Sequence, residues 1–87
     1  MALDFLNDAR SYDPSRQCVS FWGHDSAFEV TFRLDHAALS RFAGQESLSE
    51  PIALQAFDAN LVRIRNAARK LYKGPQKRYW ELSVNDI

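Results

Sequence analysis

The feature that most constrains the fold is an alternating run of residues from Ala27 to Leu34. Large apolar side chains occupy every second position, at Phe28, Val30, Phe32 and Leu34, with smaller or polar residues between them. A β-strand places successive side chains on opposite faces, so a period of two collects the four large side chains on one face. The run therefore predicts a strand whose apolar face lies in the core.

The residues before this run predict a partner strand and a tight turn. Gly23–Ser26 has the composition of a loop and would join the two strands as a hairpin. In that register the apolar side chains of both strands lie on the same face of the sheet, and Cys18, Ser20 and Trp22 lie on the opposite face. The predicted cross-strand pairs are Trp22 with Ala27, Phe21 with Phe28 and Val19 with Val30.

A short helix is predicted directly after the hairpin. The carboxylate of Asp35 can accept hydrogen bonds from the free amides of a first helical turn. Leu34 and Leu39 have the spacing of a hydrophobic staple, and Gly44 suits a helix C-terminus. These signals predict a helix over residues 36–43.

A longer amphipathic helix is predicted from about Pro51 to about Tyr72, with Ser49 or Glu50 as its cap. Its apolar residues fall on one stripe, and its basic residues lie outside that stripe. The stripe consists of Phe57, Leu61, Ile64, Ala68 and Leu71. We expect Phe57, Leu61 and Ile64 to pack on Phe28, Val30 and Phe32.

The remaining segments complete an α+β fold. Residues 3–5 alternate as a short first strand, and residues 7–16 form a polar connection with a turn at 12–15. Residues 77–82 favour a last strand, followed by a terminal turn at 83–86. The predicted order is β-β-β-α-α-β, with two helices on one face of a small, mainly antiparallel sheet.

Length and composition predict one domain, residues 1–87, in a reducing compartment. Eighty-seven residues leave no room for a second core, and eleven basic residues balance eleven acidic ones. Cys18 is the single cysteine, so no intramolecular disulfide is possible. No apolar stretch has the length of a membrane span or a signal peptide. We expect a cytoplasmic protein that does not associate with membranes.

The sequence carries no motif of the large enzyme classes. Cys18, His24 and Asp25 are the residue types of a thiol-activation site, but the predicted strand separates Cys18 from His24 by more than hydrogen-bond reach. His36 has no partner at metal-ligand spacing. We therefore predict no catalytic activity, no cofactor and no metal.

The C-terminal third is basic, with seven basic and two acidic residues in 59–87. Cations that contact phosphates and aromatics that stack on bases make nucleic-acid binding by residues 63–80 the alternative function. On a helical wheel, however, these charges cover the whole polar face, which is typical of a solvated helix. The candidate residues are Arg65, Arg69, Lys73, Lys77 and Arg78.

The two tryptophans indicate protein contacts. In the predicted register Trp22 points away from the phenylalanines, and an aromatic side chain on an open sheet face is typical of a contact with another chain. Trp80 lies on a predicted edge strand. We therefore predict a non-enzymatic interaction or accessory module that binds an unknown protein or a second copy of itself. The competing expectation is that Trp22 is covered by residues 7–16 and Trp80 is buried under the long helix.

Three patterns, taken in order, resemble a bacterial family called domain of unknown function 1488. They read YxxxRxxVxF from Tyr12, LxxxALxxF from Leu34 and AFxxNxxxIxxAA from Ala56, followed by a basic tail. The resemblance covers about residues 3 to 87 and implies a small cytoplasmic α+β protein of proteobacterial type. It implies no activity, ligand or catalytic residue. The chain departs from the family pattern at two positions. Phe32 stands where the family is associated with a cysteine, and Leu61 stands where it is associated with an arginine.

Overall fold

The computed structural model describes residues 3–74, 77 and 79–87, and the bounds of its elements follow. The strands are β1 (Leu3–Asp4), β2 (Arg10–Asp13), β3 (Cys18–Asp25), β4 (Phe28–Leu34) and β5 (Tyr79–Leu82). The helices are α1 (His36–Ala43), α2 (Glu50–Ala59) and α3 (Leu61–Leu71), and a 3-10 turn, η1, spans Val84–Asp86.

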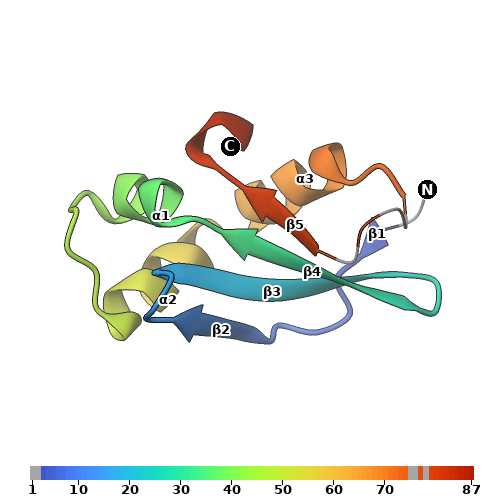
Figure 1. Cartoon of the computed structure of the whole chain (residues 1–87), viewed down its shortest axis with the longest axis horizontal. Helices are drawn as coiled ribbons and strands as arrows, with labels where there is room; N and C mark the ends of the chain where they lie inside the picture. Colours follow the sequence, from blue (N-terminus) through green and yellow to red (C-terminus); the bar gives the residue numbers. More distant parts are fainter. Residues whose placement is uncertain (1–2, 75–76, 78) are drawn as a thin grey trace.

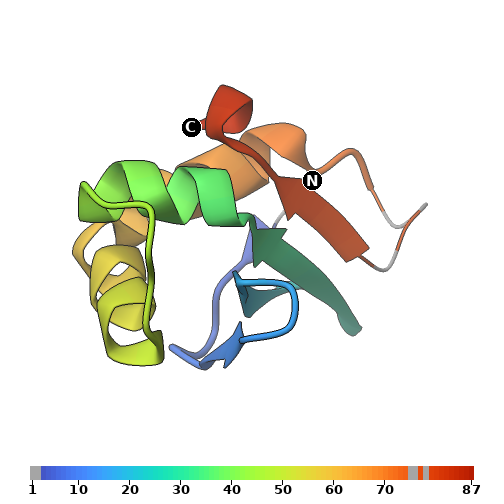
Figure 2. The same ribbon diagram turned by 60° about the vertical axis from the view of Figure 1, so that its left-hand side comes forward.

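The described strands form one mixed five-stranded sheet with β3 at its centre (Figure 1). β3 pairs antiparallel with β1 and β2 on one edge and with β4 on the other, and β5 pairs parallel with β4. Figure 2 shows the helices gathered on one side of this sheet. The predicted α+β class is confirmed, with one strand and one helix more than the predicted order.

The register of the β3–β4 hairpin differs from the predicted one. Phe21 pairs with Phe32 and Trp22 with Thr31, and the turn consists of two residues, 26 and 27. Both registers direct the same side chains toward the core-facing side of the sheet, because a slip by an even number of residues keeps the faces of a strand unchanged. Alternation alone therefore could not distinguish them.

Gly23 explains why β3 continues through the predicted loop. A Cβ atom at this position would lie 3.0 Å from Leu3 Cδ1 and 3.1 Å from a ring carbon of Phe5. The glycine therefore permits close packing of the N-terminal segment on the sheet, rather than a turn. The turn instead uses Ser26, which has a positive φ of 54°.

The predicted polar connection at residues 7–16 contains strand β2. Its residues 10–13 pair with β3, and Tyr12 packs against the core. The turn follows at residues 14–17, where Asp13 Oδ1 accepts hydrogen bonds from the amides of Ser15 and Arg16 at 2.9 and 3.3 Å. The prediction of an irregular segment was wrong because polar edge residues do not show the alternation of a half-buried strand.

The predicted long helix is two helices, α2 and α3, that meet at Asn60. Asn60 has φ −119° and ψ 22°, outside the helical region, and its side-chain amide donates to the carbonyl of Ala56 at 2.9 Å. This hydrogen bond satisfies a carbonyl at the end of α2. The apolar stripe continues across the break, with Phe57 and Ile64 both buried. Periodicity therefore predicted one helix where the backbone forms two.

The caps of α1 and α2 follow the local sequence. The side chain of Asp35 accepts from the amide of Ala38 at 2.9 Å, and Gly44 ends α1 with φ 74°. Ser49, rather than Glu50, caps α2. Strand β5 begins two residues after its predicted start. Among the described residues no helix is long and apolar enough to cross a bilayer.

The apolar face of the sheet and the inner faces of the helices form one core. Phe21 packs against Phe32 with ring centroids 5.4 Å apart and against Phe57 at 5.2 Å. Phe57 therefore packs on the sheet as predicted, but its ring contact is with Phe21, which was not among the predicted partners. Leu61 is only partly buried. The largest fully buried side chains are Phe32, Phe57, Leu34, Leu39, Ile64, Leu82, Val19 and Val30.

Phe28 was predicted to lie in the core, and that prediction was wrong, because its side chain is 62% exposed. Phe28 pairs with Asp25 at the end of the hairpin, and Figure 1 shows that this end extends past the helices. Alternation specifies which face of a strand a side chain occupies but not how far a helix covers that face.

The core assignment predicts different effects at two phenylalanines. Phe57→Ala is expected to lower the free energy of unfolding by about 3–5 kcal/mol, because it leaves a cavity in the aromatic cluster. Phe28→Ala is the matched control and is expected to lower it by no more than about 0.5 kcal/mol. Equilibrium denaturation in urea measures both changes, and equal losses would contradict this core.

Candidate interaction surfaces

The face of the sheet that no described helix covers is the first candidate surface. We call it the open face and define it by Ser20, Trp22, Glu29, Thr31, Arg33 and Tyr79. Cross-strand pairing places Trp22, Thr31 and Tyr79 in one row across β3, β4 and β5. Trp22 is half-buried and Tyr79 is 40% exposed. Two aromatic side chains therefore lie accessible on one sheet surface.

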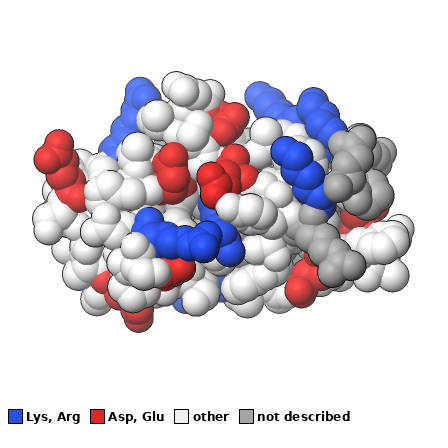
Figure 3. All heavy atoms as spheres, in the orientation of Figure 1, with Lys and Arg blue, Asp and Glu red and all other residues white. Residues whose placement is uncertain are grey.

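Charged side chains of both signs surround this aromatic row. The guanidinium of Arg33 lies 4.3 Å from the ring centroid of Tyr79, and the Tyr79 hydroxyl donates to Glu81. On β4, Glu29, Thr31 and Arg33 follow one another on the open face. Figure 3 shows acidic and basic groups intermixed in this view of the molecule. Such a surface suits a protein partner better than a polyanion.

Two of the predicted basic residues, Arg65 and Arg69, are engaged with the N-terminal segment. Their guanidinium carbons lie 5.2 and 5.1 Å from the ring centroid of Phe5. Arg65 donates to the carbonyl of Asn7 at 3.1 Å and to Asp8 Oδ1 at 3.0 Å. These arginines therefore contact the N-terminal segment and join it to α3.

Lys73 and Lys77, the other described candidates of the basic segment, have surroundings different from those of Arg65. Lys77 Nζ lies 4.8 Å from the ring centroid of Trp80, and Lys73 is exposed. Trp80 is only 6% exposed and packs edge-on against Tyr72, with centroids 5.7 Å apart. Trp80 therefore belongs to the core rather than to an interaction surface. Arg78 lies outside the described residues.

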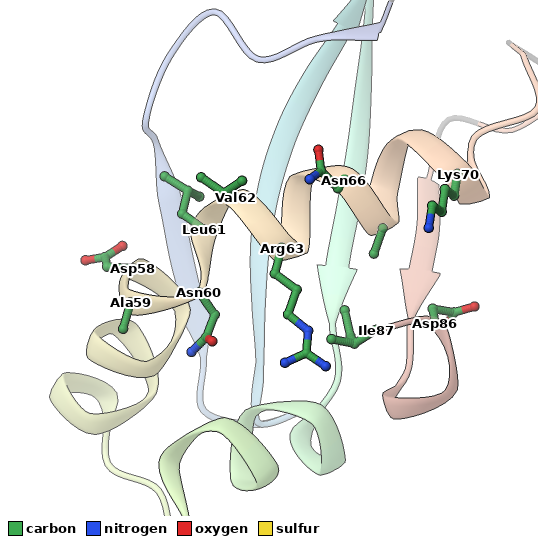
Figure 4. A pocket seen from close by; sticks show the side chains of 11 residues that line it. Asp58, Ala59, Asn60, Leu61, Val62, Arg63, Asn66, Lys70, Asp86 and Ile87 are labelled. Atoms are coloured by element: carbon green, nitrogen blue, oxygen red, sulfur yellow. The ribbon is translucent and has the colours of Figure 1, made fainter.

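The second candidate surface is an open groove of about 810 Å³ along the opposite flank of α3. Figure 4 shows Arg63 and Lys70 projecting from α3 toward Asp86 and Ile87. Val62, on the rim, is 74% exposed. Both cations belong to the basic segment 63–80, but neither was among its predicted candidate residues. Their seven-residue spacing, which places them on one helix flank, was the available signal.

The candidate catalytic residues serve structural contacts. Cys18 is 5% exposed, and burial raises the pKa of its thiol, which disfavours the reactive thiolate. Cys18 lies at the opposite end of β3 from Asp25. His24 Nε2 lies 3.8 Å from a carboxylate oxygen of Glu29. No group of three potential metal ligands occurs among the described residues.

A buried hydroxyl joins the end of α3 to the hairpin. The Tyr72 hydroxyl donates to Asp25 Oδ2 at 2.5 Å, and this hydrogen bond, with a smaller contribution from burial, raises the pKa of Tyr72 to about 12. The proton is held because ionising the phenol would place a second negative charge beside the carboxylate. Asp25 is therefore a structural partner of Tyr72 in this fold.

Taken together, the fold and its surfaces define a small α+β domain with its described helices on one face of a mixed sheet. A family model described as "Protein of unknown function (DUF1488)" matches residues 3–81. The chain belongs to this family, as the sequence resemblance predicted. No curated protein matches it.

A solved relative supports the fold. The crystal structure of a protein of unknown function from the DUF1488 family of Shewanella loihica PV-4, determined at 1.60 Å resolution, is similar to this chain with a TM-score of 0.76. The similarity covers 92% of this chain and 90% of that one, at 14% sequence identity. At this identity the likeness shows a shared fold and carries no site residue across.

The Tyr72–Asp25 contact predicts one late phenol titration. Because the pKa of Tyr72 is raised from 10.0 to about 12, the stability that this contact contributes is fully present below pH 10 and is lost as the pH rises toward 12. Ultraviolet absorbance of the phenolate measures the step. Tyr72→Phe should remove it and Tyr79→Phe should leave it in place. A late step that persists in Tyr72→Phe would assign it to another residue.

Proposed function

We propose that the protein is a non-enzymatic interaction module whose open face binds a second copy of the chain. The observation that carries the proposal is the row of Trp22, Thr31 and Tyr79 on the face that the described helices leave uncovered. Amphipathic aromatic side chains supply large contact areas at little entropic cost and are enriched in interfaces.

The charge pattern on β4 supports a symmetric partner. Glu29 and Arg33 lie two residues to either side of Thr31 on the same face. A two-fold axis parallel to the sheet and perpendicular to β4 at Thr31 would place Glu29 of each copy opposite Arg33 of the other. The pattern is therefore self-complementary in an isologous, face-to-face dimer. Zero formal net charge also leaves no net repulsion between copies.

The non-enzymatic part of the proposal is supported by the structural contacts of Asp25 and by the burial of Cys18. Asp25 accepts the hydrogen bond of Tyr72, and Cys18 is a buried thiol. A free cysteine suits the reducing cytoplasm, which is the compartment we propose.

Nucleic-acid binding by residues 63–80 is the alternative, and it is less well supported because Arg65 and Arg69 contact the N-terminal segment.

The proposal predicts that sedimentation equilibrium detects a dimer. Across the micromolar range we expect a species of twice the 10.0 kDa chain mass. Trp22→Ala should shift it to monomer, because the variant removes the aromatic anchor. Val62→Ala, on the helix side, is the control and should leave the dimer unchanged.

Charge reversal gives a sharper version of the same test. Glu29→Arg and Arg33→Glu should each weaken the dimer, because each places like charges opposite one another across the two-fold axis. The double variant Glu29→Arg/Arg33→Glu restores the complementary pattern and should recover dimerisation. A monomer at all concentrations, or a dimer indifferent to Trp22→Ala and to both single reversals, would refute the proposed interface.

A further inference from the structure

Helix α3 presents its cations in two groups with different partners. Arg65 and Arg69 face the N-terminal segment, whereas Arg63 and Lys70 line the groove on the opposite flank. Seven residues are close to two helical turns, which separates Arg63 and Lys70 by about 10.5 Å along one side of the helix. Figure 4 shows Ile87 lying between these two side chains.

The groove has unpaired positive charge. Within the described part of the chain, neither Arg63 nor Lys70 forms an ion pair, in contrast to Arg65, which lies 3.0 Å from Asp8. Arg63 is oriented by Phe42, whose ring centroid lies 5.5 Å from the guanidinium carbon. An oriented arginine loses less side-chain entropy when it binds an anion.

The two acidic residues that border the groove are already engaged. Asp58 accepts two hydrogen bonds from Arg10, at 2.9 and 2.8 Å. Asp86 accepts from the amide and hydroxyl of Ser83, at 2.8 and 3.1 Å. Asp58 is therefore paired with a cation outside the groove, whereas Asp86 keeps its negative charge but is held in place by Ser83. Arg63 and Lys70 have no such partner among the described residues and are the groups that the groove offers to an anionic ligand.

The groove also offers apolar contact. Ile87 is partly buried and lies between the two cations in Figure 4. Val62 also lines the groove and is 74% exposed. A ligand that satisfies both features carries two carboxylates about two helical turns apart and apolar side chains between them. An amphipathic acidic helix has this arrangement, and binding in such a groove is a common mode of peptide recognition.

We infer that the α3 groove binds an acidic amphipathic helix of a partner protein, with its carboxylates on Arg63 and Lys70 and its apolar side chains against Ile87 and Val62. The inference is independent of the proposed dimer, because the groove lies on the helix side of the sheet. A monomeric protein could bind the same ligand.

The test is a nuclear magnetic resonance titration with a synthetic helical peptide that carries two glutamates seven positions apart and leucines between them. Amide shifts should be confined to α3, η1 and Ile87. A control peptide with lysines in place of the glutamates should bind at least about tenfold more weakly, because its positive charges are repelled by Arg63 and Lys70.

Charge reversal of the protein should invert this preference. Arg63→Glu/Lys70→Glu is expected to lower the affinity for the glutamate peptide at least about tenfold and to bind the lysine peptide instead. Lys73→Glu is the matched control on an exposed basic residue outside the groove and should change neither affinity. Val62→Asp is a second variant. It should lower the affinity for the glutamate peptide, because it adds a negative charge and removes an apolar contact.

Three outcomes would overturn the inference. They are equal binding of the two peptides, shifts centred on another surface, and a glutamate-peptide affinity that the double charge reversal leaves unchanged in a variant with the wild-type spectrum. Failure of these experiments would leave the dimer intact as a proposal, because none of the groove variants lies on the open face.

Discussion

The structure depends on the pairing of β3 along both of its edges. β1 and β2 share one edge and β4 occupies the other, so this single strand positions the N-terminal segment and the hairpin together. The close approach of Leu3 and Phe5 to Gly23 is part of that arrangement, because a side chain at Gly23 would occupy the space they fill. The N-terminal segment is therefore fixed along one edge of β3, with Leu3 buried and Phe5 packed against the core.

The helices follow from this sheet. Its apolar face is covered by α2 and α3, which place Phe57 against Phe21 and bring Arg65 and Arg69 over Phe5. With Arg65 and Arg69 in contact with the N-terminal segment, Arg63 and Lys70 remain on the other flank of α3, and neither forms an ion pair within the described residues. The same packing leaves one sheet face uncovered, with Trp22 and Tyr79 on it. Both candidate surfaces therefore result from the packing of the helices on one face of the sheet.

Sequence reasoning succeeded where a local pattern has one physical meaning. Asp35 and Gly44 bounded α1 correctly, and alternation identified the core face of β4. It failed where tertiary contacts decide between locally equivalent states. Gly23 was interpreted as a turn because its role depends on Leu3, twenty residues away, and the break at Asn60 was missed because the apolar stripe continues through it. Helical spacing separates Arg63 and Lys70 from Arg65 and Arg69, but it does not show that the N-terminal segment contacts the second pair, because that contact joins residues about sixty positions apart.

The most direct test of the central role of β3 is the set of cross-strand nuclear Overhauser contacts in the hairpin. The account predicts backbone contacts between Trp22 and Thr31, together with contacts that join His24 to Asp4 across the other edge. Contacts of Trp22 with Ala27 instead would place Gly23 in a loop, detach β1 from the end of β3 and contradict the account.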